Sequence, residues 1–175
     1  MTRIGVVGAG RVGAVLAAAL RTAGHDIVAV AGESPASRTR IETLLPGVHV
    51  DKPTAVARAC DLLLLTVPDD MLENVVNMLS AAGAIRSGQY VVHTSGKHGL
   101  AALAPAAARG AHVLAMHPAM TFTGTDVDLA RENVAGGLLD LEAAGRLLEL
   151  WGRLRRSLFA TRPAELRRRA WRFPV

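Results

Sequence analysis

Six residues near the start of the chain constrain its fold more than any other segment: Gly8-Ala9-Gly10-Arg11-Val12-Gly13, which match the pattern G-x-G-x-x-G. The short apolar run Arg3–Val7 before them predicts a buried β-strand, and Val12–Ala23 after them predict a helix. Between a strand and a helix, the first glycine permits a tight turn, the second lets a diphosphate approach the backbone, and the third lets the helix pack on the strand. The hexapeptide therefore predicts a phosphate-binding turn, with a plain glycine turn as the alternative.

The rest of the first 130 residues alternates predicted strands with predicted helices. The expected strands are Asp26–Ala31, Val48–Val50, Asp61–Val67, Tyr90–His93 and His112–Met116, and the expected helices are Thr39–Leu45, Thr54–Ala59, Met71–Ala82 and Leu100–Ala108. A continuous apolar strand such as Asp61–Val67 is typical of a sheet covered on both faces. We therefore predict an α/β fold with a doubly wound, mostly parallel sheet for residues 1–130, and a short helical extension for residues 131–175.

Composition excludes several classes of protein. Half of the 175 residues are hydrophobic, which suits one packed domain with a short appendage. The single cysteine, Cys60, cannot form an internal disulfide, so we expect a cytoplasmic protein. Apolar runs fall far short of the ~20 residues of a membrane helix, and the start of the chain lacks the pattern of a signal peptide.

The net charge of +5 is unevenly distributed. Residues 1–145 hold 11 Lys and Arg against 13 Asp and Glu, whereas residues 146–175 hold nine Arg against two Glu. A basic tail on an acidic body is not the charge pattern of a groove-reading module, so we expect no nucleic-acid partner.

The segment after the second expected strand should contact the ribose 2′ position of a bound dinucleotide. Glu33 lies where a carboxylate would bind a ribose diol, which favours NAD. Ser34, Ser37, Arg38 and Arg40 are close by in the sequence and could instead bind a 2′-phosphate, which slightly favours NADP. The alternative for the two arginines is a solvated helix start.

Polar residues follow three other expected strands, at the edge where ligands bind in open α/β sheets. Val67, Pro68 and Asp69 end the first of these strands, with Asp69 also a candidate helix cap. His93-Thr94-Ser95-Gly96-Lys97-His98-Gly99 and His117-Pro118-Ala119-Met120-Thr121-Phe122-Thr123-Gly124 follow the other two. Concentration of polar side chains on several loops at one edge predicts a binding site.

The segments GAGRVG, DLLLLTVPDD, HTSGKHG and HPAMTFTG, in this order and spacing, resemble a bacterial family of Rossmann-like NAD(P)-dependent oxidoreductases with a C-terminal helical domain of unknown function. That family is similar in layout to pyrroline-5-carboxylate reductase, ketopantoate reductase and the 6-phosphogluconate dehydrogenase superfamily. The resemblance covers roughly residues 1–130 and implies NADP or NAD as cofactor and a small-molecule substrate. It also implies that Val67-Pro68-Asp69 line the nicotinamide half of the cofactor, that Thr94-Ser95-Gly96 lie near the nicotinamide and substrate, and that His117 faces a cleft between domains.

Hydride transfer belongs to the cofactor, so the protein would supply orientation and a proton donor. His93, His98 and His117 could act as general acids or bases, because histidine titrates near neutrality. The candidate catalytic residues are His93, His117 and Ser95, the last because the resemblance implies that its loop lies near the nicotinamide and substrate. A structural hydrogen-bonding role is the alternative for each histidine. The spacings His93/His98 and His112/His117 lack the further ligands of a tetrahedral site, so we expect no metal. Ser95 lacks a G-x-S-x-G context, which argues against a hydrolase.

The tail departs from the resembled family. Leu141–Phe159 predict an amphipathic helix and Pro163 a further helix to about Arg172, in place of the family's helical substrate domain. We expect this domain to be truncated, frame-shifted or replaced, which would leave the chain incomplete for turnover. The alternatives are a non-catalytic dinucleotide-binding or regulatory module, and a protein that docks on a partner through its basic tail. The apolar stripe of Leu141–Phe159 also suits packing on its own sheet or a homodimer contact.

Overall fold

The computed structural model describes residues 1–118 and 121–129 of the chain. The helices expected at Leu141–Phe159 and from Pro163, and the homodimer contact through them, lie outside the described residues. The candidate cofactor-binding and catalytic residues all lie within the described residues.

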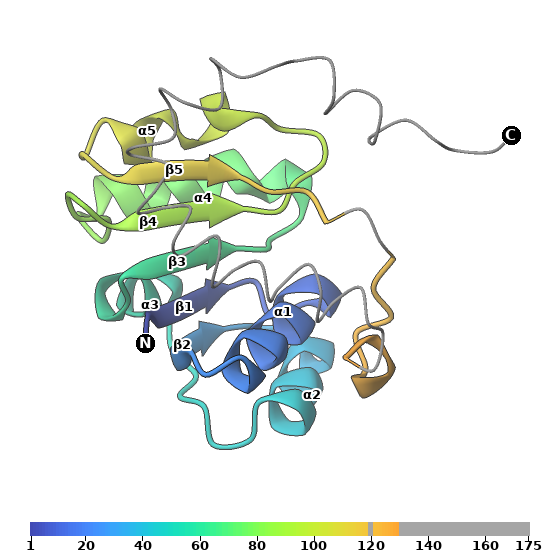
Figure 1. Ribbon diagram of the computed structural model, residues 1–175. Helices are drawn as coiled ribbons and strands as arrows, with labels where there is room; N and C mark the ends of the chain where they lie inside the picture. Colours follow the sequence, from blue (N-terminus) through green and yellow to red (C-terminus); the bar gives the residue numbers. More distant parts are fainter. Residues whose placement is uncertain (119–120, 130–175) are drawn as a thin grey trace, which may run out of the picture. The chain divides into compact units, whose positions relative to one another are not determined.

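A parallel sheet of five strands, in the order β2-β1-β3-β4-β5, forms the centre of the fold (Figure 1). Every neighbouring pair of strands runs parallel. The strands are β1 (Arg3–Val7), β2 (Asp26–Ala31), β3 (Leu62–Leu65), β4 (Tyr90–His93) and β5 (His112–Ala115). The α/β fold with a mostly parallel, doubly wound sheet, predicted from the alternation of strands and helices, is thereby confirmed.

Helices connect the strands along the chain, at positions close to those predicted. They are α1 (Arg11–Thr22), α2 (Pro35–Leu44), α3 (Pro53–Ala59), α4 (Asp69–Ala81) and α5 (Ala104–Ala107), with short 3₁₀ helices η1 (Leu100–Leu103) and η2 (Asp126–Asp128). The apolar α1, predicted at Val12–Ala23, lies one residue nearer the glycine turn. The helix predicted at Leu100–Ala108 is a 3₁₀ turn followed by a short α-helix, in which Pro105 stands in the first turn, where its missing N–H costs nothing.

Two predicted elements at the edge of the sheet differ from the structure. The helix predicted at Thr39–Leu45 is present, but its predicted start was wrong, because α2 begins at Pro35: the Ser34 hydroxyl accepts a hydrogen bond from Ser37 N at 3.1 Å and caps the helix. The strand predicted at Val48–Val50 is reduced to one parallel bridge between Val50 and Val30. A single bridge satisfies few backbone groups, so this edge of the sheet stays open beside α2.

Helices cover both faces of the sheet. In Figure 1, α1 lies in front of the strands, α2 lies next to α1 at the β2 edge, and α4 lies behind the strands. The rear core joins alternate strand residues, such as Leu63 and Leu65, to α3, α4, η1 and α5. Cys60 lies in this core, where burial raises the pKa of its thiol to about 11 and makes it a poor nucleophile.

The strand order places the reversal of the sheet between β1 and β3. The chain adds β2 on one side of β1 and then crosses to place β3 on the other. Loops after β1 and β3 therefore diverge toward opposite faces, which opens a crevice at the carboxyl ends of these strands. The glycine turn and the Val67-Pro68-Asp69 turn lie at this point.

Candidate functional site

The turn after β1 is held against the two neighbouring strands. The N–H groups of Gly8 and Ala9 both donate to Ala31 O at 3.0 Å, at the end of β2. Gly8 has φ +101°, and a Cβ on it would lie 2.7 Å from Thr66 C and from Val67 N. Only glycine fits this backbone position, as expected for the first glycine of the motif.

Gly10 differs from its neighbours because the space beside it is open. A Cβ on Gly10 would meet nothing closer than Gly8 O at 4.0 Å. Gly10 is also the N-cap of α1, and no side chain caps the helix. The N–H groups of the first turn of α1 therefore have no side-chain acceptor. The open space beside Gly10 and these N–H groups is here called the cradle, and the side chain of any other residue at position 10 would enter it.

Thr66 fastens the glycine turn to the end of β3, a role that sequence reasoning missed. Its hydroxyl donates to Gly8 O at 2.7 Å, and its own N–H donates to Val7 O at 2.9 Å. A Cβ on Gly13 would overlap both Thr66 Oγ1 and Gly8 O, so the third glycine lets α1 pack against this junction. Nothing in the sequence pairs Thr66 with a residue 58 positions away.

The turn after β3 contains three further residues that were predicted to contact the cofactor. Val67 is half-buried, whereas Pro68 and Asp69 are exposed. The prediction of Asp69 as a cap was wrong: Pro68 holds the N-cap position and Asp69 is the first residue of α4. Its carboxylate instead lies in the first helical turn, where negative charge is favoured by the helix dipole.

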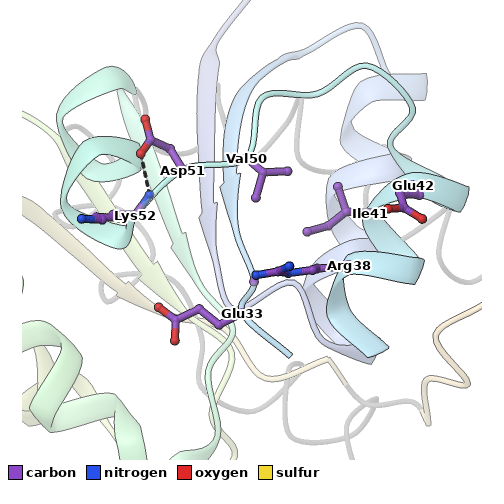
Figure 2. A pocket seen from close by; sticks show the side chains of 8 residues that line it. Glu33, Arg38, Ile41, Glu42, Val50, Asp51 and Lys52 are labelled. Atoms are coloured by element: carbon purple, nitrogen blue, oxygen red, sulfur yellow. Dashed lines mark hydrogen bonds between the residues drawn. The ribbon is translucent and has the colours of Figure 1, made fainter. Parts of the chain in front are cut away.

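A hollow of about 500 Å³ lies at the end of β2, between α2 and residues 50–52 (Figure 2). Its lining residues include Glu33, Arg38 and Lys52, and Arg38 extends from α2 toward the end of β2. Two of the residues that were predicted to bind a 2′-phosphate do not line this hollow. Ser34 caps α2, and Arg40 donates a hydrogen bond to Ala36 O at 3.1 Å. Sequence reasoning missed Lys52, because its approach depends on the bridge between Val50 and Val30.

His93 is fully buried at the end of β4, and both nitrogens of its ring are used internally. Nδ1 accepts a hydrogen bond from Ser95 N at 3.2 Å, so Nε2 carries the proton, which it donates to Gly99 O at 3.2 Å. Burial lowers the pKa of His93, which keeps the ring neutral. In this state His93 holds the loop after β4 at both ends.

The lowered pKa of His93 predicts a pH dependence of stability. Because the unfolded state takes up the proton at a higher pH than the folded state, the stabilisation is complete above about pH 6.5 and is lost as pH falls below it, by up to about 1.4 kcal/mol per pH unit. Urea denaturation of the wild type and of His93→Asn between pH 5 and 8 measures this. The wild-type slope below pH 6.5 should shrink in the variant, and equal slopes would contradict the assignment.

The loop after β4 brings three candidate residues together. Ser95 Oγ accepts from the N–H groups of Lys97 and His98 at 3.2 and 3.1 Å, and Thr94 N donates to Leu65 O at 3.2 Å. The exposed ring of His117, from the end of β5, lies 3.4 Å from Thr94 O through Nδ1. A Cβ on Gly96 would lie 2.7 Å from His117 Cε1, so this glycine makes room for the ring.

Two findings bear on other classes of site. Within residues 1–118 and 121–129, no group of three or more His, Cys, Asp or Glu side chains is arranged to hold a metal ion. The same part of the chain contains no helix with the length and apolar character needed to cross a membrane.

Together, the doubly wound parallel sheet and the glycine turn at its reversal point define a nucleotide-binding type of α/β domain. The chain belongs to the Rossmann-like domain family, whose model matches residues 1–118.

Solved structures agree with this fold. The chain is similar to prephenate dehydrogenase from A. aeolicus in complex with hydroxyphenyl propionate and NAD+ (19% identity, TM-score 0.57, 68% of this chain and 42% of that one). It is also similar to imine reductases from Streptomyces aurantiacus (22%, 0.51, 65% and 40%) and a Pseudomonas species (24%, 0.50, 62% and 36%). The chain therefore spans less than half the length of each. No curated protein sequence matches it.

Proposed function

We propose that this protein binds NAD(P) through residues 1–130 and belongs to an oxidoreductase that transfers hydride to or from a small molecule. The observation that carries the proposal is the open cradle at Gly10, where the first N–H groups of α1 have no side-chain acceptor. The cradle lies where the strand order of the sheet reverses. Backbone donors and the positive end of a helix dipole bind a diphosphate without a lysine or a metal. The dehydrogenase and reductases of similar fold support the redox assignment.

In this proposal the cofactor extends along the carboxyl edge of the sheet. Its diphosphate contacts Gly8–Gly13, its adenosine ribose lies near Glu33 and Arg38, and its nicotinamide lies between the Val67–Asp69 turn and Thr94. The hydrogen bond from Thr94 N to Leu65 O keeps these last two loops together. We favour NADP over NAD, because Arg38 and Lys52 both line the hollow at the end of β2 and can pair with a 2′-phosphate.

Arg38→Ala tests this preference. We expect NADPH to bind about tenfold more weakly and NADH about equally well, because only NADPH loses a charge-assisted contact to the 2′-phosphate. Isothermal titration with both cofactors gives the two dissociation constants, with Arg21→Ala, whose guanidinium binds Pro46 O, as the control. An equal loss for both cofactors would contradict a 2′-phosphate contact.

When bound, the nicotinamide would supply or accept the hydride, so the protein's own residues orient substrate and move protons. The exposed ring of His117, seated on Gly96, is the group best placed to exchange a proton with solvent or substrate. We assign the buried His93 to positioning Ser95 and Gly99. The Ser95 hydroxyl, which accepts two N–H bonds, keeps its own proton available as a donor.

Titration of the purified 175-residue chain with NADH and NADPH tests the binding, and oxidation of NADPH with imines or keto acids tests the turnover. We expect binding with little turnover. Binding without any turnover would favour the non-catalytic module, and no binding of either cofactor would overturn the proposal.

A further inference from the structure

The last part of the HPAMTFTG segment lies far from the strand that precedes it. β5 is at one edge of the sheet, yet Thr123–Asp126 line a second hollow together with Thr39 and Arg40 of α2, next to β2 at the other edge (Figure 1). Residues 121–129, here called the 121–129 loop, thus reach the side of the sheet where the glycine turn and α2 lie.

A buried carboxylate gives this loop a fixed shape. Asp128 is fully buried, and its Oδ2 accepts from the N–H groups of Thr123 and Gly124, both at 2.8 Å. Burial by itself raises the pKa of Asp128, but these N–H donors outweigh it and the net pKa is lowered, so the carboxylate stays charged. Gly124 has φ +83°, a conformation that favours glycine.

Gly124 is packed against Arg11 of the glycine turn and Arg40 of α2. A Cβ on it would lie 2.8 Å from Arg40 Nε, 2.9 Å from Arg11 Cγ and 3.0 Å from Arg11 Cα. Arg11 is the first residue of α1, directly after the open cradle of Gly10. The loop therefore packs against the backbone and the stem of Arg11 and against the guanidinium end of Arg40.

Neither arginine is neutralised within residues 1–118 and 121–129. The ion pairs there are His49–Asp51, Arg86–Asp61 and His98–Glu73. The Arg40 guanidinium donates to one backbone oxygen, Ala36 O, and remains cationic toward the loop. Gly124 thus contacts two arginines, and no ion pair joins either of them to a carboxylate in the described residues. Arginine side chains of this kind suit a phosphate group.

From this arrangement we infer that the 121–129 loop is part of the dinucleotide site: it positions Arg11 and Arg40 to bind the diphosphate of the cofactor, an inference that rests on the proposed function above. Asp128 and Gly124 are positioning residues, which act on the cofactor only through the two arginines. The loop that follows β5 would then contribute to cofactor affinity at the opposite edge of the sheet.

Gly124→Ala, with Gly88→Ala as a matched control, tests the inference. Gly88 has φ +76° but a Cβ on it would meet nothing within 4 Å, so the two variants share backbone strain and differ in the contact with the arginines. We expect Gly124→Ala to weaken NADPH and ADP-ribose binding about tenfold and Gly88→Ala to leave both within about twofold. Asp128→Ala, which removes the cap of the loop, should match Gly124→Ala; circular dichroism establishes that each variant is folded.

A double-mutant cycle separates positioning from general damage. In an Arg11→Gln, Arg40→Gln background, Gly124→Ala should cause no further loss of affinity, because the two guanidinium groups through which the loop would act on the cofactor are gone. Equal affinities of Gly124→Ala and Gly88→Ala, or an undiminished loss in the glutamine background, would overturn the inference while leaving the proposed function intact. Failure of the wild type to bind either NADPH or ADP-ribose would instead overturn the proposed function, and this inference with it.

Discussion

Gly10→Ala should abolish cofactor binding while leaving the protein folded. The backbone of Gly10 has φ −77° and ψ −159°, which alanine adopts readily, and its Cβ would meet no protein atom closer than 4.0 Å. The methyl group would instead occupy the space through which a diphosphate approaches the N–H groups of α1. We expect a loss of affinity of about a hundredfold or more, together with unchanged or slightly higher stability, because alanine restricts the unfolded chain.

Gly99→Ala is the matched control for this variant. Gly99 also has extended backbone angles at a helix N-cap, φ −92° and ψ −166°, and open space beside it. Calorimetric titration with NADPH and thermal melting of both variants give the comparison. If Gly10→Ala binds NADPH as well as Gly99→Ala does, the cradle is not the diphosphate site and the proposed function loses its main support.

The glycine turn was predictable because its determinants are local. Strand, turn and helix follow one another within about twenty residues of sequence, and each glycine has a backbone reason to be there. The continuous apolar run before Val67 likewise indicated a central strand, and β3 lies between β1 and β4. The parallel sheet follows from this alternation, because parallel strands require crossover connections.

Features that depend on contacts between distant segments could not be predicted in this way. The Thr66 hydroxyl, at the end of β3, donates to Gly8 O, at the end of the neighbouring strand β1, and only the register of β1 with β3 brings the two residues together. The place of Lys52 in the lining of the same hollow as Arg38 depends on one bridge at the sheet edge. The 121–129 loop is the extreme case, since Gly124, from the segment that follows the strand at one edge of the sheet, packs on Arg11 and Arg40. The candidate site residues remain predictions until cofactor binding is measured.

Gly13→Ala should destabilise the fold, whereas Gly10→Ala should leave stability unchanged or slightly higher, although both glycines belong to the same turn. Alanine in a helix interior normally stabilises it by about 1 kcal/mol relative to glycine. Here the Cβ would overlap Thr66 Oγ1 and Gly8 O, and Gly8 O is backbone that cannot move without opening the junction of β1, α1 and β3. We expect the overlap to dominate and the free energy of unfolding to fall by about 3 kcal/mol.

Chemical denaturation of the wild type, Gly13→Ala and Gly13→Ala/Thr66→Ala measures this loss. The double variant removes the hydroxyl contact and leaves the carbonyl contact, so we expect it to recover part of the stability lost by Gly13→Ala and not all of it. A Gly13→Ala protein as stable as the wild type would show that α1 stands farther from β3 than the hydrogen bond of Thr66 to Gly8 requires. In that case the geometry of the cradle, which α1 and Thr66 together define, would have to be revised as well.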